Sequence, residues 1–175
     1  IPDYNRYADE VLAKGLDPAA LKEPKDLERK GRYEDPRYME LLTPHFYARH
    51  ICRLEEWPDG VTRAFNKINK QVYVLMQGPS ELGASGKLLN RDRTADLGKI
   101  TAPALMIGAE HDTMAPHHME MMSKKVQRGR YLHCAKGSHM AMYDDSETYV
   151  RGLVKFLKDV DEGRVCCHRS DCHRG

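Results

Sequence analysis

The chain has 175 residues with 28 basic and 26 acidic side chains, so its net charge is close to neutral. This balance, with no basic stripe interleaved with aromatic residues, argues against a nucleic-acid partner. No stretch reaches the run of about 18 apolar residues that a membrane span requires, and no signal segment is recognised, so a cytoplasmic protein without membrane association is expected. The start at Ile1-Pro2, in place of methionine, indicates a fragment.

Residues 1–70 are predicted to form a series of short helices. Apolar positions recur at helical spacing between residues 4 and 12. Asp17 and Asp35 each precede a proline, which is the pattern of a capping residue followed by proline at the first helical position. Three prolines are expected to break the series: Pro24, Pro44 and Pro58.

The pattern changes after residue 70. The runs QVYVLM (71–76), APALMIG (102–108) and RYLHC (130–134) are short, apolar and bounded by turn residues, which predicts buried strands of a mainly parallel sheet. Residues 146–160 carry apolar side chains on one helical face. Alternating strands and helices predict an α/β domain.

The last residues are expected to be disordered, because no apolar periodicity supports a fold there. They contain a cluster of cysteine and histidine residues: Cys166, Cys167, His168, Cys172 and His173. The spacing of this cluster matches no standard zinc site, so no metal site is predicted. No cofactor is expected either, because the sequence lacks a glycine-rich phosphate-binding loop.

Two residues that can carry chemistry follow successive predicted strands. Asp112, in PALMIGAEHDTMAP, comes a few residues after one strand, and His139, in YLHCAKGSHMAMYDD, follows the next strand 27 residues later. Open α/β sheets place their sites at such strand ends. An acid and then a histidine in this order matches the second half of a Ser-Asp-His triad, in which the acid orients the imidazole and the imidazole moves the proton.

The segment GPSE, the Gly-x-x-His-Asp turn that ends at Asp112, and the turn GSHMAMYDD are similar to those of the proline iminopeptidases (prolyl aminopeptidases) of the α/β-hydrolase superfamily. The resemblance extends over about residues 1–163. It implies an α/β fold, the C-terminal half of an α/β-hydrolase sheet preceded by an all-helical cap. The implied organisation is a cap over 1–70, part of the hydrolase domain over 71–163, and a disordered tail over 164–175.

By the same resemblance, Asp112 is the triad acid and His139 is the triad base. Glu81 is one of the carboxylates that receive the free α-amino group of the substrate, and Glu56, or its neighbour Glu55, is a second. Ser80 is not expected to be the nucleophile, because GPSELG spaces its second glycine one residue too far for a nucleophile elbow. The family's nucleophile would precede the cap, upstream of Ile1.

The expected function is release of N-terminal proline from a peptide or amide by the intact enzyme, of which this chain carries the acid and the base but not the serine. Two alternatives remain open: another α/β-hydrolase such as an amidase or epoxide hydrolase, and a non-catalytic binding fragment. An unpaired sheet edge and uncovered apolar faces would favour self-association or pairing with the missing N-terminal half.

Overall fold

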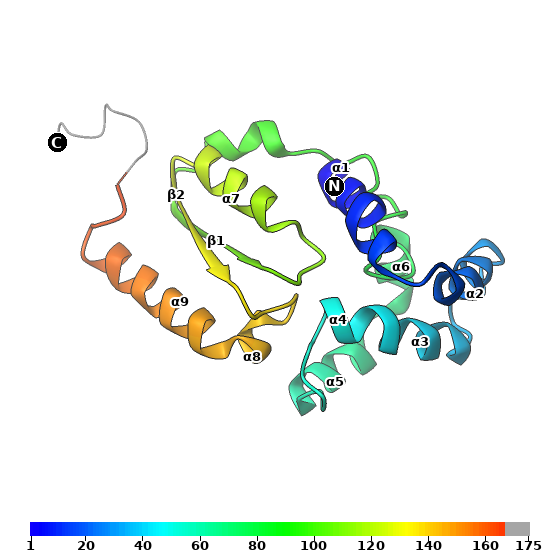
Figure 1. Cartoon of the computed structure of the whole chain (residues 1–175). Helices are drawn as coiled ribbons and strands as arrows, with labels where there is room; N and C mark the ends of the chain where they lie inside the picture. The colour runs from blue at the N-terminus through cyan, green and yellow to red at the C-terminus, as the bar shows by residue number, and fades with distance from the viewer. Residues whose placement is uncertain (167–175) are drawn as a thin grey trace. The chain divides into compact units, whose positions relative to one another are not determined.

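The computed structural model describes residues 1–166 and divides the chain into two compact units, which meet between Arg91 and Asp92 (Figure 1). Within the described residues, no helix combines the length and the apolar character that crossing a membrane requires. The expected cap boundary at residue 70 and the division at Arg91 differ, because residues 71–91 pack with the first unit.

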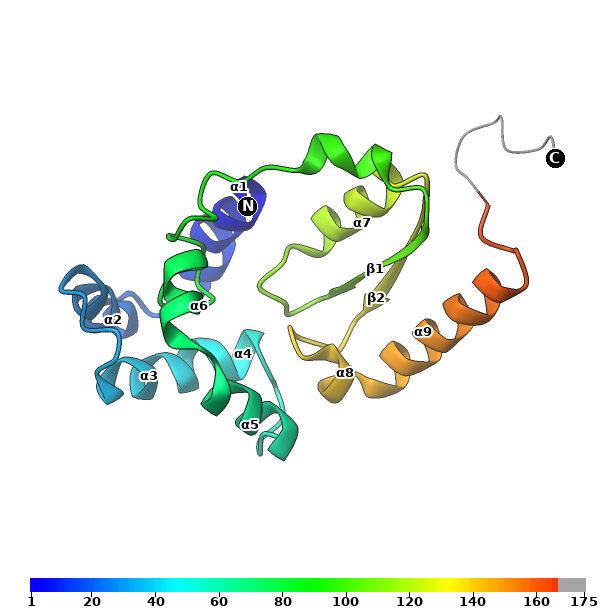
Figure 2. The same ribbon diagram turned by 180° about the vertical axis from the view of Figure 1, so that it is seen from behind.

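The first unit is built of helices (Figures 1 and 2). Its α-helices are α1 (Pro2–Tyr7), α2 (Pro18–Arg29), α3 (Pro36–Leu42), α4 (Ala48–His50), α5 (Asp59–Lys67) and α6 (Lys70–Met76). Short π-helical or 3₁₀ turns connect some of them: η1 (Ala8–Leu12), η2 (Ala13–Gly15) and η3 (Thr43–Tyr47).

Two aspartates begin helices as predicted. The carboxylate of Asp17 accepts a hydrogen bond from the backbone N–H of Ala19 (2.9 Å), and that of Asp35 accepts one from Arg37 (3.1 Å). Each carboxylate thereby satisfies an N–H group that has no partner inside the helix. The predicted break at Pro24 is wrong, because α2 continues through it. The Pro24 ring is fully buried in this helix, which packs on α3, and this burial offsets the loss of one backbone hydrogen bond.

The predicted strand over 71–76 is also wrong, because these residues form helix α6. The side chain of Asn69 caps this helix by accepting a hydrogen bond from the N–H of Val72 (3.1 Å). A run of five apolar residues, as over 72–76, has no periodicity that separates a strand from a helix. The local cap therefore decides the conformation, and Val72 and Leu75 remain about half exposed.

The core of the first unit lies where α3, η3 and the turn after α4 meet. Tyr38, Leu42, Phe46 and Ile51 are at most 2% exposed. Burial of side chains of this size is the main favourable term in folding such a unit. The core supports a wall of aromatic rings that extends from Tyr47 toward α5.

The second unit alternates strands and helices. It contains η4 (Thr94–Lys99), β1 (Pro103–Ala109), α7 (Pro116–Lys125), β2 (Arg128–Cys134), α8 (Ala141–Asp144) and α9 (Ser146–Asp161). In the described part of the chain, β1 and β2 form a two-stranded parallel sheet in register from Pro103 opposite Arg128 to Ala109 opposite Cys134. The predicted strands over 102–108 and 130–134 and the predicted helix over 146–160 are therefore confirmed.

Helices cover both faces of this sheet, α7 on one side and α9 on the other (Figures 1 and 2). Glycines permit the close packing. A Cβ atom at Gly129 would lie 2.0 Å from the carbonyl oxygen of Ser123 in α7, and one at Gly152 in α9 would lie 2.5 Å from Leu132. This layered arrangement is that of an α/β domain.

The chain beyond α9 returns to the sheet before the described residues end. Val165 is buried, and its carbonyl accepts a hydrogen bond from Arg128. Asp159 is also buried and accepts from Lys155, Arg164 and Arg130, and these hydrogen bonds hold the pKa of its carboxyl well below the usual range. The structure therefore differs from the expected tail at Arg164 and Val165. Residues 167–175, with most of the cysteine and histidine cluster, lie outside the described residues.

Candidate functional site

Asp112 lies in the turn that follows β1. Its N–H donates to the carbonyl of Ala109 (3.2 Å), which closes the turn directly at the strand end. Oδ1 of its carboxylate accepts from the N–H of Met114 (3.2 Å) and from Oγ1 of Thr113 (3.3 Å). These donors fix the carboxylate, which is 8% exposed as a residue.

His139 lies in the turn that follows β2. Because β1 and β2 are neighbouring parallel strands, both turns emerge at the same edge of the sheet. The N–H of His111 donates to the carbonyl of Gly137 (3.0 Å), which ties the first turn to the second. A Cβ atom at Gly137 would lie 2.8 Å from that of Ala141, so a residue without a side chain lets this turn close tightly.

These turns bring Asp112 and His139 together. Nδ1 of His139 lies 2.9 Å from Oδ1 of Asp112. An ionised carboxylate only accepts hydrogen bonds, so Nδ1 is the nitrogen that carries the proton, and Nε2 is then the basic nitrogen. The imidazole is 35% exposed and the carboxylate 11%. The pair has the orientation of an acid that holds a general base in one tautomer.

Glu81 lies in the first unit, inside a cluster of tyrosine side chains. The hydroxyl of Tyr73 in α6 donates to Oε1 of Glu81 (2.5 Å), and that of Tyr4 in α1 lies 3.4 Å from Oε2. The hydroxyl of Tyr4 donates to the backbone carbonyl of Glu81 (2.5 Å). The backbone N–H of Glu81 donates to the hydroxyl of Tyr47 (3.3 Å). Three separate elements therefore hold Glu81, through its carboxylate, its backbone carbonyl and its backbone N–H.

The cluster is partly dry. Burial raises the pKa of the Tyr73 phenol, and the negative charge of Glu81 raises it further. The pKa of Tyr4 is raised by the same two causes in the same order. Both phenols are therefore neutral donors at ordinary pH. Tyr4 gives its one proton to the backbone carbonyl of Glu81, so Tyr73 is the tyrosine that donates to the carboxylate, and further lone pairs of the carboxylate remain for another hydrogen-bond donor.

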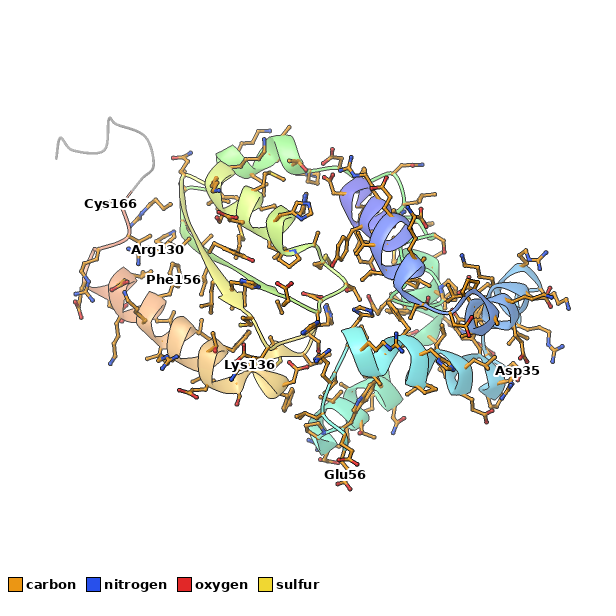
Figure 3. The ribbon with its side chains drawn as sticks, viewed as in Figure 1. Asp35, Glu56, Arg130, Lys136, Phe156 and Cys166 are labelled. Carbon is orange, nitrogen blue, oxygen red and sulfur yellow. The ribbon has the colours of Figure 1, made fainter. Side chains whose placement is uncertain are left out.

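Glu56 and Glu55 are exposed in the loop that precedes α5, and Figure 3 shows Glu56 pointing away from the ribbon of its unit. Ser80 is buried, and its Oγ accepts a hydrogen bond from the N–H of Leu82 (3.3 Å). Within the described residues, no group of three or more side chains could hold a metal ion.

The tyrosines around Glu81 were missed from sequence. The sequence pattern places Tyr4 only on a helical face and predicts a strand at Tyr73. The contact between Tyr4 and Glu81 joins positions 77 residues apart, which no local pattern encodes. The nearest signal in the sequence is the count of nine tyrosines against three phenylalanines, which favours buried hydroxyl groups with polar partners.

No family model matches the chain. The solved structure of VinJ superposes on 89% of the chain with a TM-score of 0.81 at 23% identity, which is a likeness of fold alone. The proline iminopeptidase of Mycobacterium smegmatis superposes on 91% of the chain with a TM-score of 0.73 at 25% identity. The fold is that of part of an α/β-hydrolase, as the sequence predicted.

The relatives found by sequence are more specific than the fold, because they share one name. The proline iminopeptidase of Flavobacterium johnsoniae is 54% identical over 94% of the chain, and that of Elizabethkingia meningoseptica is 52% identical over 91%. The proline iminopeptidase of Chitinophaga pinensis is 47% identical over 91%. The chain is a homologue of the proline iminopeptidases, and it spans about half the length of these relatives, 54–55% in each.

Proposed function

We propose that this chain supplies the acid, the base and the amino-group receptor of a serine-type aminopeptidase that releases N-terminal proline. The observation that carries the proposal is the 2.9 Å contact between Asp112 and His139 at the ends of adjacent parallel strands. Homology to enzymes named proline iminopeptidase supports the proposed substrate class. The substrate is a peptide or amide with a free N-terminal proline.

In the proposed reaction, Nε2 of His139 takes the proton of a serine hydroxyl as the serine oxygen attacks the proline carbonyl. Asp112 stabilises the resulting imidazolium, and the imidazolium then gives its proton to the leaving amine. Water releases proline from the acyl-enzyme in a second step, with His139 again acting as base. Asp112 remains ionised throughout.

Glu81 is proposed to bind the protonated imino group of the substrate. A carboxylate in a partly dry cluster pairs strongly with an ammonium group. A substrate with a blocked N-terminus cannot make this pair and would leave the half-buried carboxylate without an ammonium partner. Glu56 stays the proposed second carboxylate, and its exposure predicts a smaller contribution.

The nucleophile is proposed to lie in the portion of the relatives that this chain does not match. The sequence contains no Gly-x-Ser-x-Gly elbow. Helix α9 exposes an apolar stripe of Val150, Val154 and Leu157, which are 43–52% exposed. We propose that the same missing portion, or in its absence a second copy of the chain, covers this stripe.

The test uses a fused enzyme, in which the part of the Flavobacterium johnsoniae enzyme that this chain does not match is joined ahead of Ile1. Proline 4-nitroanilide should be hydrolysed, and N-acetylproline 4-nitroanilide should not. His139→Ala should abolish turnover, whereas His117→Ala, which changes an exposed histidine of the same unit, should not. Equal turnover of the free and blocked substrates would contradict the proposed role of Glu81.

The carboxylates are compared in the same enzyme. Glu81→Gln should raise KM for proline 4-nitroanilide at least tenfold, because one charge-assisted hydrogen bond contributes about 1.5–3 kcal/mol. Glu56→Gln should have a smaller effect, and the exposed Glu147→Gln on α9 is the control. A larger effect of Glu56→Gln than of Glu81→Gln would exchange their assignments.

A further inference from the structure

The first unit contains a cavity of about 390 Å³ to which the proposed reaction assigns no group of the substrate. This volume lies in the lower part of the range of roughly 300–1,000 Å³ that is typical of small-molecule sites. Its lining is mainly aromatic and apolar, with a few polar groups. The main lining side chains are Met39, Tyr47, Trp57, Phe65, Ile68 and Tyr73.

The aromatic wall is held in place by contacts between its own members. The ring centroids of Trp57 and Phe65 lie 5.2 Å apart, and those of Tyr47 and Phe65 lie 5.9 Å apart in an edge-to-face arrangement. The indole N–H of Trp57 donates to the carbonyl of Cys52 (3.1 Å), which fixes the orientation of the ring. A preformed wall of this kind binds apolar groups without first having to order itself.

Two lining residues also contact Glu81. Tyr73 donates to its carboxylate, and Tyr47 accepts from its N–H. The cavity therefore begins within one tyrosine side chain of the proposed amino-group receptor. An extended peptide advances about 3.3–3.6 Å per residue. When its N-terminus is held at Glu81, its second side chain can therefore extend past one tyrosine side chain and reach the cavity.

We propose that this cavity binds the apolar side chain that follows the N-terminal proline of a peptide, with aromatic and branched residues preferred over glycine. The inference rests on the proposed function for the identity of the N-terminal residue. The two features on which it depends are the aromatic lining and the shared walls at Tyr47 and Tyr73. It assigns a specificity to the substrate beyond its first residue.

Trp57 is the single tryptophan of the chain and lines the cavity, so its fluorescence reports on occupancy. The purified 175-residue chain is titrated with Pro-Phe-amide, with Pro-Gly-amide and with N-acetyl-Pro-Phe-amide. Pro-Phe-amide should give a saturable change in Trp57 emission and bind at least about tenfold more tightly than Pro-Gly-amide, as burial of an aromatic side chain predicts. Equal binding of the two free dipeptide amides, or no saturable change with Pro-Phe-amide, would overturn the inference.

The location is tested by filling the cavity. Thr62 lines it from the exposed surface of α5, whereas Ala64, exposed on the same helix, does not line it. Thr62→Phe should remove the preference for Pro-Phe-amide, and Ala64→Phe should keep it. Asn66→Phe fills the same cavity from another position, and circular dichroism checks that each variant is folded. If both filling variants keep the preference of the Ala64→Phe control, the cavity is not the site.

The blocked peptide separates this inference from the proposed function. If N-acetyl-Pro-Phe-amide binds as tightly as Pro-Phe-amide and both exceed Pro-Gly-amide, the cavity inference stands and recognition of the amine by Glu81 fails. If acetylation abolishes binding while Pro-Phe-amide and Pro-Gly-amide bind equally, amine recognition stands and the cavity inference fails.

Discussion

A triad acid has two tasks: it fixes the tautomer of the histidine, and its negative charge stabilises the imidazolium. Replacing Asp112 by asparagine separates these tasks. Three donors converge on Oδ1 of Asp112: Nδ1 of His139 at 2.9 Å, the N–H of Met114 at 3.2 Å and Oγ1 of Thr113 at 3.3 Å. In Asp112→Asn, an amide nitrogen at this position would face the N–H of Met114, and an unsatisfied buried donor costs about 1–3 kcal/mol. The amide oxygen should therefore keep the position, and His139 should keep its proton on Nδ1.

What Asp112→Asn removes is the negative charge. At 2.9 Å and an effective dielectric constant of about 20, the attraction between carboxylate and imidazolium is roughly 6 kcal/mol. Solvent at the partly exposed imidazole reduces this to about 4 kcal/mol, which corresponds to about a thousandfold in rate. The variant should therefore lose about a thousandfold in kcat with an unchanged tautomer.

Two measurements check this prediction. Nitrogen-15 correlation spectra of the 175-residue chain should show the same Nδ1–H tautomer of His139 in the wild type and in Asp112→Asn. In the fused enzyme, kcat for proline 4-nitroanilide should fall as stated, whereas Asp161→Asn, at an exposed carboxylate, should be neutral. A switch to the Nε2–H tautomer would contradict the predicted position of the amide oxygen, and a loss in kcat below tenfold would contradict the predicted role of the carboxylate charge.

Three further predictions follow from close packing and from shifted pKa values. Gly129→Ala should destabilise the second unit by about 1–3 kcal/mol or more, measured as faster hydrogen exchange in β2, because its Cβ atom would lie 2.0 Å from a carbonyl oxygen of α7; unchanged exchange would contradict that packing. Burial raises the pKa of the Cys134 thiol to about 11, so iodoacetamide at pH 8 should modify the exposed Cys166 and leave Cys134 intact by mass spectrometry. The raised pKa of the Tyr73 phenol means that its neutral form contributes stability that is complete below about pH 10 and declines as the pH rises further. Glu81→Gln removes the second cause of that shift after burial, so Tyr73 should ionise at lower pH in an absorbance titration, and an unchanged titration would remove Glu81 as a cause.

The parts of the fold that sequence predicted are those where local pattern and burial agree. The strands β1 and β2 are apolar runs bounded by turns, and parallel pairing buries them under helices. Helix α6 is not predictable from its apolar run, because the run is short and half exposed, and the conformation depends on the single capping side chain of Asn69. The predicted helix break at Pro24 is wrong because burial of the proline ring can compensate for a lost hydrogen bond inside a helix.

Some features of the candidate site are also predictable from sequence, and others are not. The pairing of Asp112 with His139 was predictable, because both follow successive strands and parallel strands end at one edge of a sheet. The donors to Glu81 and the aromatic cavity were not predictable. Tyr4 reaches Glu81 across 77 residues, and Trp57 meets Phe65 only through the packing of a loop on α5. Such contacts depend on tertiary packing, which residue type and spacing alone do not encode.

Hydrolysis of proline 4-nitroanilide by the fused enzyme, by its Ser80→Ala and His139→Ala variants, and by the unaltered 175-residue chain tests most directly whether His139 is the base and Ser80 is not the nucleophile. We expect an inactive 175-residue chain, an active fused enzyme, retained activity in Ser80→Ala, and a loss of about a millionfold in His139→Ala. Activity of the 175-residue chain that Ser80→Ala abolishes, or full activity of the His139→Ala variant, would contradict these expectations.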